Sequence, residues 1–310
     1  MIFSTMNETE VSNRILTDLN TGDDGPVLII IGGLHGNELA GVSAIRTLSE
    51  WLSRDGVLKS GRVMGIVGNP EAVKRQVRYQ DEDLNRIWLP EIIDEVRSQN
   101  ESEILSSERR ELKELLQILD PILADRSRRV IAVDLHSFSA PEGYFAITPE
   151  SVYNEKLLNS IGIPAIFGIE KILPGTLLHY IHNCGHQAFA FEGGSHYSSE
   201  TLVNMVSFIR MLAMELELCD TAESADYIHL HNPLNNTLPS QMKLVYQHII
   251  SSSDEFVMRP GFTNFQPVQK GDWLAEDING KIKAPCGGYI LMPLYQNQGS
   301  DGFFLVAPRI

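Results

Sequence analysis

Two histidines and a glutamate in this sequence have the side chains of a hydrolytic metal site. The stretch "GGLHGNELAG" places His35 and Glu38 three residues apart, and "VDLHS" contributes His136. Two imidazoles and one carboxylate are the protein ligands of a common catalytic zinc site, in which the fourth position is left to water. Bound zinc lowers the pKa of water to about 7 and polarises a carbonyl group. The three residues therefore predict a site for one Zn²⁺ per chain.

The elements that must position these residues read as an α/β fold. Short apolar runs alternate with helical patterns, which predicts a mixed, mostly parallel sheet flanked by helices. The expected strands cover residues 26–33, 62–70, 129–136, 143–148, 164–169 and 187–194, and the expected helices cover 38–52, 108–123 and 198–218. Pro121 is expected to kink the second of these helices.

Ligands of parallel α/β sheets bind at the carboxyl ends of the strands. His35 lies just beyond the first expected strand, His136 ends the third, and Glu192 in "FAFEGG" ends the sixth. The two glycines before His35 allow a close backbone approach. Asp134, two residues before His136, is a candidate for orienting a metal ligand or for a structural role. The fold would thus bring separate parts of the chain to one site.

Simpler interpretations exist for each residue alone. A histidine at a strand end is usually an ordinary polar loop residue, and Glu38 could simply favour the start of a helix. A competing metal set is His179, His182 and His186 in "LLHYIHNCGHQ", but no carboxylate lies near it in the sequence. We expect these three to be surface or loop histidines. Cys184 beside them is expected to be a small hydrophobic residue rather than a nucleophile.

Composition excludes several classes of partner. The 310 residues include 43% hydrophobic and 21% charged residues, and the formal net charge is −15. This charge argues against nucleic acid and anionic membrane surfaces as partners, and no apolar run is long enough to span a bilayer. The first twelve residues lack a signal-peptide pattern. The three cysteines form no CxxC pair and favour a reducing compartment, so we expect a cytoplasmic protein, with homo-oligomer formation left open.

The composition and the pattern of the sequence change near residue 220. Beyond it, short strand-like runs separate turns rich in Gly, Pro, Asn and Asp, as in "SADYIHLHNPLNN" and "GDWLAEDINGKIKAPCGGY". We expect a catalytic α/β domain over residues 1–220 and a small β-rich domain over residues 221–310.

A second segment that could take part in the chemistry of the site is "NPEAVKRQVRYQDEDLNRIW", residues 69–88. It is either a charged surface loop or an anion pocket. In the second case Arg78 and Arg86 have the right chemistry, because a guanidinium binds a carboxylate in bidentate fashion or stabilises a developing oxyanion.

These motifs, in this order, resemble the aspartoacylase and succinylglutamate desuccinylase family, relatives of the zinc carboxypeptidases. The resemblance covers nearly the whole chain and extends weakly to "FQPVQKGDWLAEDINGKIKAPCGGYILMPLY". It implies a zinc-carboxypeptidase-like α/β domain followed by a small β domain that shapes the site entrance.

The resemblance also implies roles for individual residues. His35, Glu38 and His136 would bind zinc, and Glu192 would take a proton from the attacking water and return it to the leaving amine. The other three roles concern the substrate: Arg78 would polarise the scissile carbonyl and stabilise the oxyanion, and Asn85 and Arg86 would hold the α-carboxylate.

Two departures from the family's pattern concern the substrate. Family members resemble one another in a second carboxylate-binding arginine upstream of the catalytic glutamate, but "YIHNCGHQ" has none, and His182 lies near the matching place. They also present a tyrosine from the C-terminal domain. Here "NQGSDGFF" has none, and Tyr289 and Tyr295 lie earlier.

The sequence therefore predicts a zinc-dependent hydrolase that removes the acyl group from an N-acylated amino acid or a similar small carboxylated molecule. Two alternatives remain: a zinc carboxypeptidase acting on short peptides, and an inactive member that binds a small carboxylated ligand.

Overall fold

The computed structural model describes residues 13–220, 238–251 and 253–309. Its helices are α1 (Leu39–Leu52), α2 (Pro70–Arg75), α3 (Pro90–Ser98), α4 (Ser107–Ala124), α5 (Val152–Ser160), α6 (Ile169–Ile172), α7 (Leu177–Asn183) and α8 (Ser199–Glu215), with short 3₁₀ turns at Leu84–Arg86 (η2) and Glu101–Glu103 (η3). Helix α4 continues through Pro121 to Ala124.

Eleven strands form one mixed sheet within the described residues. In spatial order they are β1 (Ile15–Asn20), β3 (Arg62–Val67), β2 (Val27–Gly32), β4 (Val130–Phe138), β7 (Gln187–Ser195), β5 (Phe145–Ile147), β6 (Ala165–Phe167), β8 (Gln241–Ile249), β14 (Asp301–Pro308), β13 (Gly288–Leu291) and β10 (Pro267–Val268). The six strands predicted in the first two thirds are all present, although the ends differ. The sequence did not predict β1, which pairs antiparallel with β3 at the sheet edge.

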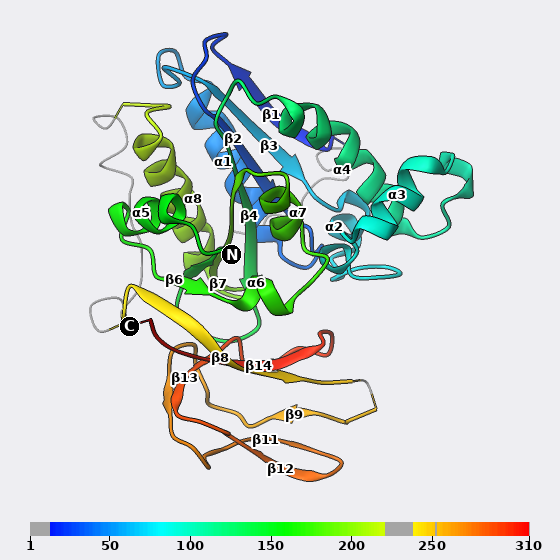
Figure 1. Cartoon of the computed structure of the whole chain (residues 1–310), viewed down its shortest axis with the longest axis vertical. Coiled ribbons are helices and arrows are strands. Elements are labelled where there is room, and N and C mark those ends of the chain that lie inside the picture. Colours follow the sequence, from blue (N-terminus) through cyan, green and yellow to red (C-terminus); the bar gives the residue numbers. More distant parts are fainter. Residues whose placement is uncertain (1–12, 221–237, 252, 310) are drawn as a thin grey trace.

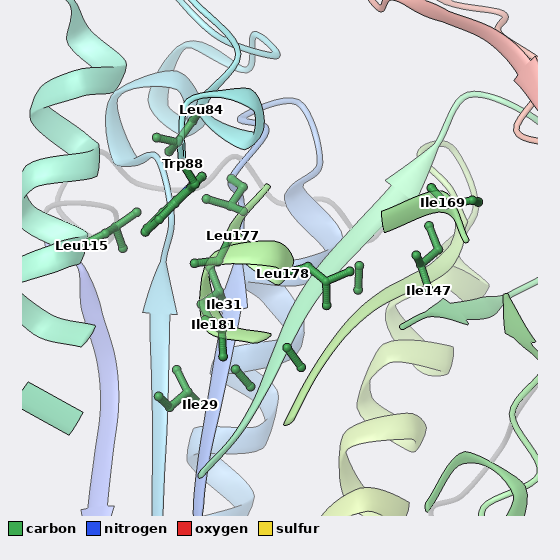
Figure 2. Packing of buried hydrophobic residues seen from close by; sticks show 14 of the residues in the cluster. Ile29, Ile31, Leu84, Trp88, Leu115, Ile147, Ile169, Leu177, Leu178 and Ile181 are labelled. Carbon is green, nitrogen blue, oxygen red and sulfur yellow. The ribbon is translucent and has the colours of Figure 1, made fainter. Parts of the chain in front are cut away.

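The central strands are buried on both faces, because helices cover each side. In β2, Ile29 and Ile31 belong to one buried cluster, together with residues of α4 and α7 (Figure 2), whereas Leu28 and Ile30 belong to another with residues of α1 and α8. This division explains why the strand is continuously apolar rather than alternating. The predicted mixed sheet with flanking helices is confirmed.

The C-terminal part is β-rich, as predicted, and it continues the main sheet. Strand β8 pairs parallel with β6, and β14, β13 and β10 follow it with antiparallel pairing. A smaller sheet of β12 (Gly280–Lys283), β11 (Trp273–Asp277) and β9 (Val257–Met258) lies beyond them (Figure 1). Main-chain hydrogen bonds therefore tie the C-terminal strands to the α/β part.

Some predictions fall wholly or partly on residues that are not described. The boundary near residue 220 adjoins 221–237, which include "SADYIHLHNPLNN", and the stretch without a signal-peptide pattern is 1–12. The division into two domains stays a prediction. Among the described residues, no helix combines the length and the apolar character needed to cross a membrane.

Candidate metal and substrate site

The loop after β2 holds His35 and Glu38 against the end of the sheet. Gly33 has a left-handed backbone with φ of 72°, and a Cβ on Gly36 would lie 2.1 Å from the carbonyl carbon of Ala72. Such a turn and such a close approach favour glycine at both positions. The loop therefore passes tightly over α2 and directs the His35 side chain inward.

His136 and Glu192 lie opposite each other on neighbouring parallel strands. They are partners in the register of β4 and β7. Both strands run further than the sequence predicted, β4 to Phe138 and β7 to Ser195, so His136 and Glu192 lie within their strands, near the ends. The correction is small, since both residues still face the carboxyl end of the sheet, where a site is expected.

The structure brings His35, Glu38 and His136 into one buried group that could hold a metal ion. One donor atom from each lies within 4.8 Å of the others. His35 Nδ1 is 2.8 Å from Glu38 Oε1, and His136 Nδ1 is 3.0 Å from Glu38 Oε2. Glu38 makes no capping hydrogen bond to helix α1, which argues against an ordinary helix-start role.

Separate carboxylates orient the two imidazoles from the far side. His35 Nε2 lies 3.0 Å from Asp83 Oδ1, and His136 Nε2 lies 2.6 Å from Asp134 Oδ2. A histidine that binds metal through one nitrogen usually donates its other N–H to such a group. The donor set therefore fits a divalent metal such as zinc, with both Nδ1 atoms facing Glu38.

The charges of this group are tightly interdependent. Burial opposes the ionised form of Glu38, but His35 and His136 hold its pKa well below the ordinary value. Burial likewise opposes the charged form of His136, yet Asp134 and Glu38 raise its pKa well above the usual range. A proton on this imidazole is thus stabilised between two carboxylates, at a place where a metal cation would be stabilised in the same way.

Glu192 is buried beside this group and has a free oxygen. Its Oε2 has no hydrogen-bond partner among the described residues. Burial raises the pKa of Glu192 to about 8, and the negative charges of Glu38 and Asp134 add to the effect, while His136 and Arg78 oppose it. The carboxyl group can therefore hold or release a proton near neutral pH.

The predicted anion segment also reaches the pocket. Arg78 Nη1 lies 3.5 Å from Glu38 Oε1, and its Nη2 donates to Asp83 Oδ2 at 3.1 Å. Asn85 Nδ2 is 3.2 Å from His136 Nε2, and Asn85 Oδ1 accepts from Leu177 N at 3.0 Å. These contacts place the segment in the site rather than in a surface loop.

Arg86 has an acidic neighbour that the sequence analysis did not identify. Its Nη2 donates to Asp301 Oδ2 at 3.2 Å, and Gln247 Nε2 donates to Asp301 Oδ1 at 2.7 Å. Asp301 begins strand β14, so the C-terminal part supplies it across the sheet. Nothing in the local sequence links positions 86 and 301.

All seven predicted site residues line one pocket, which encloses about 930 Å³ including its open mouth. The C-terminal part contributes Met292, Pro293, Leu294, Gln296, Gly299, Ser300, Asp301 and Phe304 to its wall. The described lining includes no tyrosine. The Tyr295 hydroxyl instead donates to Arg259 O and accepts from Phe262 N, both at 2.9 Å.

The competing histidine set does not form a metal site. Among the described residues, the only group with metal-ligand geometry is His35, Glu38 and His136. His182 is exposed and does not line the pocket, so it does not replace the absent arginine; from the same helix, Leu178 lines the wall.

Two further residues connect the metal group to the C-terminal loop. Ser137 N donates to Glu38 Oε2 at 2.9 Å, and Ser137 Oγ lies 2.7 Å from His196 Nδ1. His196 Nε2 lies 3.2 Å from Gln296 Oε1. The sequence did not predict this series of hydrogen bonds. It also did not predict the role of Asp83, although Asp83 lies in the segment "YQDEDLNR", part of the candidate anion pocket.

Comparison with known proteins decides the family. Residues 24–216 match the succinylglutamate desuccinylase/aspartoacylase catalytic domain. The chain belongs to this family. A succinylglutamate desuccinylase of Pseudomonas paraeruginosa is 28% identical over 296 residues, which cover 90% of this chain and 82% of that protein.

Solved structures agree on the fold. The succinylglutamate desuccinylase of Vibrio parahaemolyticus matches with a TM-score of 0.66 at 17% identity, covering 94% of this chain and 85% of the other. Murine aminoacylase 3 matches with a TM-score of 0.60 at 19% identity, covering 93% and 96%. The family resemblance is confirmed, and deacylation is the class of reaction to which it points.

Proposed function

We propose that this protein is a zinc-dependent amidohydrolase that removes the acyl group from an N-acylated amino acid. The observation that carries the proposal is the convergence of His35, Glu38 and His136 in a pocket that also holds Glu192 and Arg78. A ligand set, a proton-transfer group and a cation for a developing oxyanion are the parts that amide hydrolysis needs.

His35, Glu38 and His136 would hold the zinc ion, oriented by Asp83 and Asp134. When bound, zinc supplies Lewis acidity toward the carbonyl and lowers the pKa of water. Glu192 then acts as the proton carrier: its buried carboxylate accepts a proton from the attacking water and returns it to the leaving amine. Its Oε2 makes no hydrogen bond to the protein within the described residues.

Substrate positioning falls to the segment around η2. Arg78 would face the scissile carbonyl and stabilise its negative charge as the amide is attacked. Asn85 and Arg86 would hold the α-carboxylate, with Arg86 exchanging its contact with Asp301 for one with the substrate. A guanidinium suits this task because its donors match both carboxylate oxygens.

We prefer a small substrate over a peptide because the C-terminal part forms one side of the pocket wall. Eight residues of the C-terminal part contribute to its wall, among them Asp301 and Phe304. A carboxypeptidase would need room for the chain that precedes the cleaved residue, whereas an N-acyl amino acid has only a short acyl group there. A binding protein without activity would not require the buried Glu192.

The missing arginine predicts the kind of side chain. Leu178 lines the wall contributed by α7, so nothing from that helix pairs with an acidic side chain. A lost charged hydrogen bond to a carboxylate costs about 1.5–3 kcal/mol, or roughly one to two decades in kcat/KM. We therefore expect N-acetyl derivatives of neutral or other non-acidic residues to be better substrates than N-acetylaspartate.

A hydrolysis screen tests the proposal. N-acetyl, N-succinyl and N-formyl amino acids are assayed beside short peptides, with zinc present and after chelation. We expect amine release from N-acyl amino acids that is lost on chelation and restored by zinc. Faster cleavage of peptides would support the carboxypeptidase alternative, and binding without turnover of any compound would support the inactive one. A preference for N-acetylaspartate above about one decade would overturn the inference from the missing arginine.

A further inference from the structure

The pocket lining contains two chemically different groups of residues, which we call the metal end and the substrate end. The metal end comprises His35, Glu38, His136, Glu192 and Arg78. The substrate end is formed by apolar side chains from six elements and the segments beside them: Phe138, Ile147, Ile169, Leu173, Leu178, Ala190, Met292, Leu294 and Phe304. Of these, Ile147, Ile169 and Leu178 belong to the buried hydrophobic cluster drawn in Figure 2. Such a wall suits an aliphatic group of the substrate.

Glu170 interrupts this apolar lining with a carboxyl group. It lies in the short helix α6, lines the pocket, and is only 6% exposed. Its Oε2 accepts a hydrogen bond from Gly168 N at 2.7 Å, but its Oε1 is buried with no hydrogen-bond partner among the described residues. Burial raises the pKa of Glu170, although backbone hydrogen bonds partly oppose this.

No side chain of the protein neutralises this carboxyl group by a direct contact within the described structure. The adjacent Lys171 extends to Glu150, with Nζ 3.2 Å from Glu150 Oε1. A buried carboxylate without a partner is costly, and a buried unpaired oxygen usually has an identifiable reason. A ligand group that donates a hydrogen bond would remove the cost.

The connection between α6 and α7 packs on the residues proposed to bind the α-carboxylate. Leu177 N donates to Asn85 Oδ1 at 3.0 Å, and a Cβ on Gly175 would lie 2.2 Å from Arg86 O. The Cα atom of an amino acid carries both the α-carboxylate and the side chain. A carboxylate held at Asn85 and Arg86 would therefore leave the side chain within reach of the wall formed by this segment.

On the basis of the proposed function, we propose that the substrate end of the pocket binds the side chain of the amino acid. This side chain would be an aliphatic stem that ends in an ammonium group, and Glu170 would be its counter-ion. The methylenes would pack on Ile169, Leu173 and Leu178, and the ammonium would donate to the Glu170 carboxylate. Long basic side chains commonly combine an apolar stem with a charged end in this way. A side chain ending in a carboxylate would instead face Glu170 and be repelled.

The test compares substrates that differ at the end of the side chain. The kcat/KM values of wild-type zinc enzyme are measured for the Nα-acetyl derivatives of lysine, ornithine, norleucine, glutamine and glutamate. We expect lysine or ornithine to exceed norleucine by about ten- to a hundredfold, the range of one charged hydrogen bond, and glutamate to be the poorest. If the glutamine derivative equals the basic ones, a neutral donor suffices and the ammonium assignment is wrong.

Glu170→Gln tests the residue itself, because it keeps the shape and removes the charge. We expect the ratio of kcat/KM for the lysine derivative to that for norleucine to fall by about tenfold or more, mainly through KM. Glu91→Gln, on the exposed face of α3, removes the same charge away from the pocket and should leave the ratio unchanged. An equal loss on all substrates would show a structural role and overturn the proposal.

Calorimetry separates this proposal from the proposed reaction. Binding of Nα-acetyl-lysine and Nα-acetyl-norleucine is measured on zinc-loaded Glu192→Gln protein, with and without Glu170→Gln. Glu170-dependent preference for the lysine derivative supports the subsite even if the wild type hydrolyses nothing, in which case the proposed reaction fails alone. Hydrolysis or binding without any preference for the ammonium group overturns the subsite alone.

Discussion

At the metal end of the pocket, the side chains are joined by hydrogen bonds between polar atoms. The residues that make the hydrogen bonds around Glu38 and the two histidines all belong to the first two thirds of the chain. Glu38 binds both imidazoles and the Ser137 amide, and Asp83 and Asp134 hold the outer ring nitrogens. The substrate end is different. It is mostly apolar, it draws on the C-terminal strands, and its few charged groups are either paired across the sheet, as Asp301 is, or unpaired, as Glu170 Oε1 is.

This contrast is explained by the different functions of the two ends, which are metal binding and substrate binding. A metal centre needs fixed ligands, and here Glu38 and the ring nitrogens of both histidines are already held by protein contacts, although Asp134 Oδ1 and Glu192 Oε2 have no hydrogen-bond partner within the described residues. A substrate subsite needs groups whose partners arrive with the ligand, so unfilled contacts there are expected. Changes at the metal end should therefore abolish the reaction, and changes at the substrate end should redistribute specificity.

The largest effect is expected for His136→Ala. This change removes a proposed zinc ligand and leaves Glu38 and Asp134 as buried carboxylates without their shared partner. We expect near-complete loss of bound zinc, measured by metal analysis after dialysis. His182→Ala, an exposed histidine of the competing set, is the control and should keep one zinc per chain. Stoichiometric metal in His136→Ala would move the site elsewhere.

Glu192→Gln should separate metal binding from catalysis. Glutamine has nearly the same shape but cannot accept a proton from water, so the zinc content should persist while kcat falls by about 10²–10⁴-fold. The two measurements are metal analysis and steady-state turnover on the best substrate of the screen. Turnover near the wild-type value would remove Glu192 from the mechanism.

The metal-free protein offers a pH test of the same residue. The pKa of Glu192 is raised to about 8 in the folded state, against about 4.3 for a free glutamate. The folded state therefore keeps a proton that the unfolded state releases, and wild-type stability falls as pH rises between these values. The Glu192→Gln variant should not show this decrease in stability as the pH rises.

Thermal or urea unfolding with chelator present measures the effect. We expect the mutant to gain at least about 1 kcal/mol over wild type on going from pH 4.5 to pH 8.5, since one pKa unit corresponds to about 1.4 kcal/mol. A constant difference between the two proteins across this range would show that Glu192 titrates normally.

The smallest effect is expected at the substrate end, for Asp301→Asn. The partly exposed pair between Arg86 and Asp301 competes with a substrate carboxylate for the guanidinium. Pairs of this kind contribute about 0.2–1 kcal/mol, so KM for carboxylated substrates should fall by roughly two- to fivefold with kcat little changed. A higher KM would instead make Asp301 a positioning residue for Arg86.

The candidate metal end could be predicted from the sequence alone. Strand patterns could be recognised from continuous apolar runs, and parallel strands place their carboxyl ends at one edge, so His35, His136 and Glu192 could be brought together without coordinates. The motif order then indicated the family. Strand β1 was not predicted because it is a partly exposed edge strand without a distinctive apolar pattern.

The rest of the pocket could be located only once the three-dimensional arrangement of the strands was known. The pairing of β8 with β6 carries the C-terminal strands to the pocket, and this brings Asp301 to Arg86 and Gln296 to His196. Contacts between residues so far apart in the chain leave no periodic trace in a single sequence. Glu170 was hidden for a related reason: a lone glutamate in a helical stretch resembles any exposed acid until packing buries one of its oxygens beside a cavity.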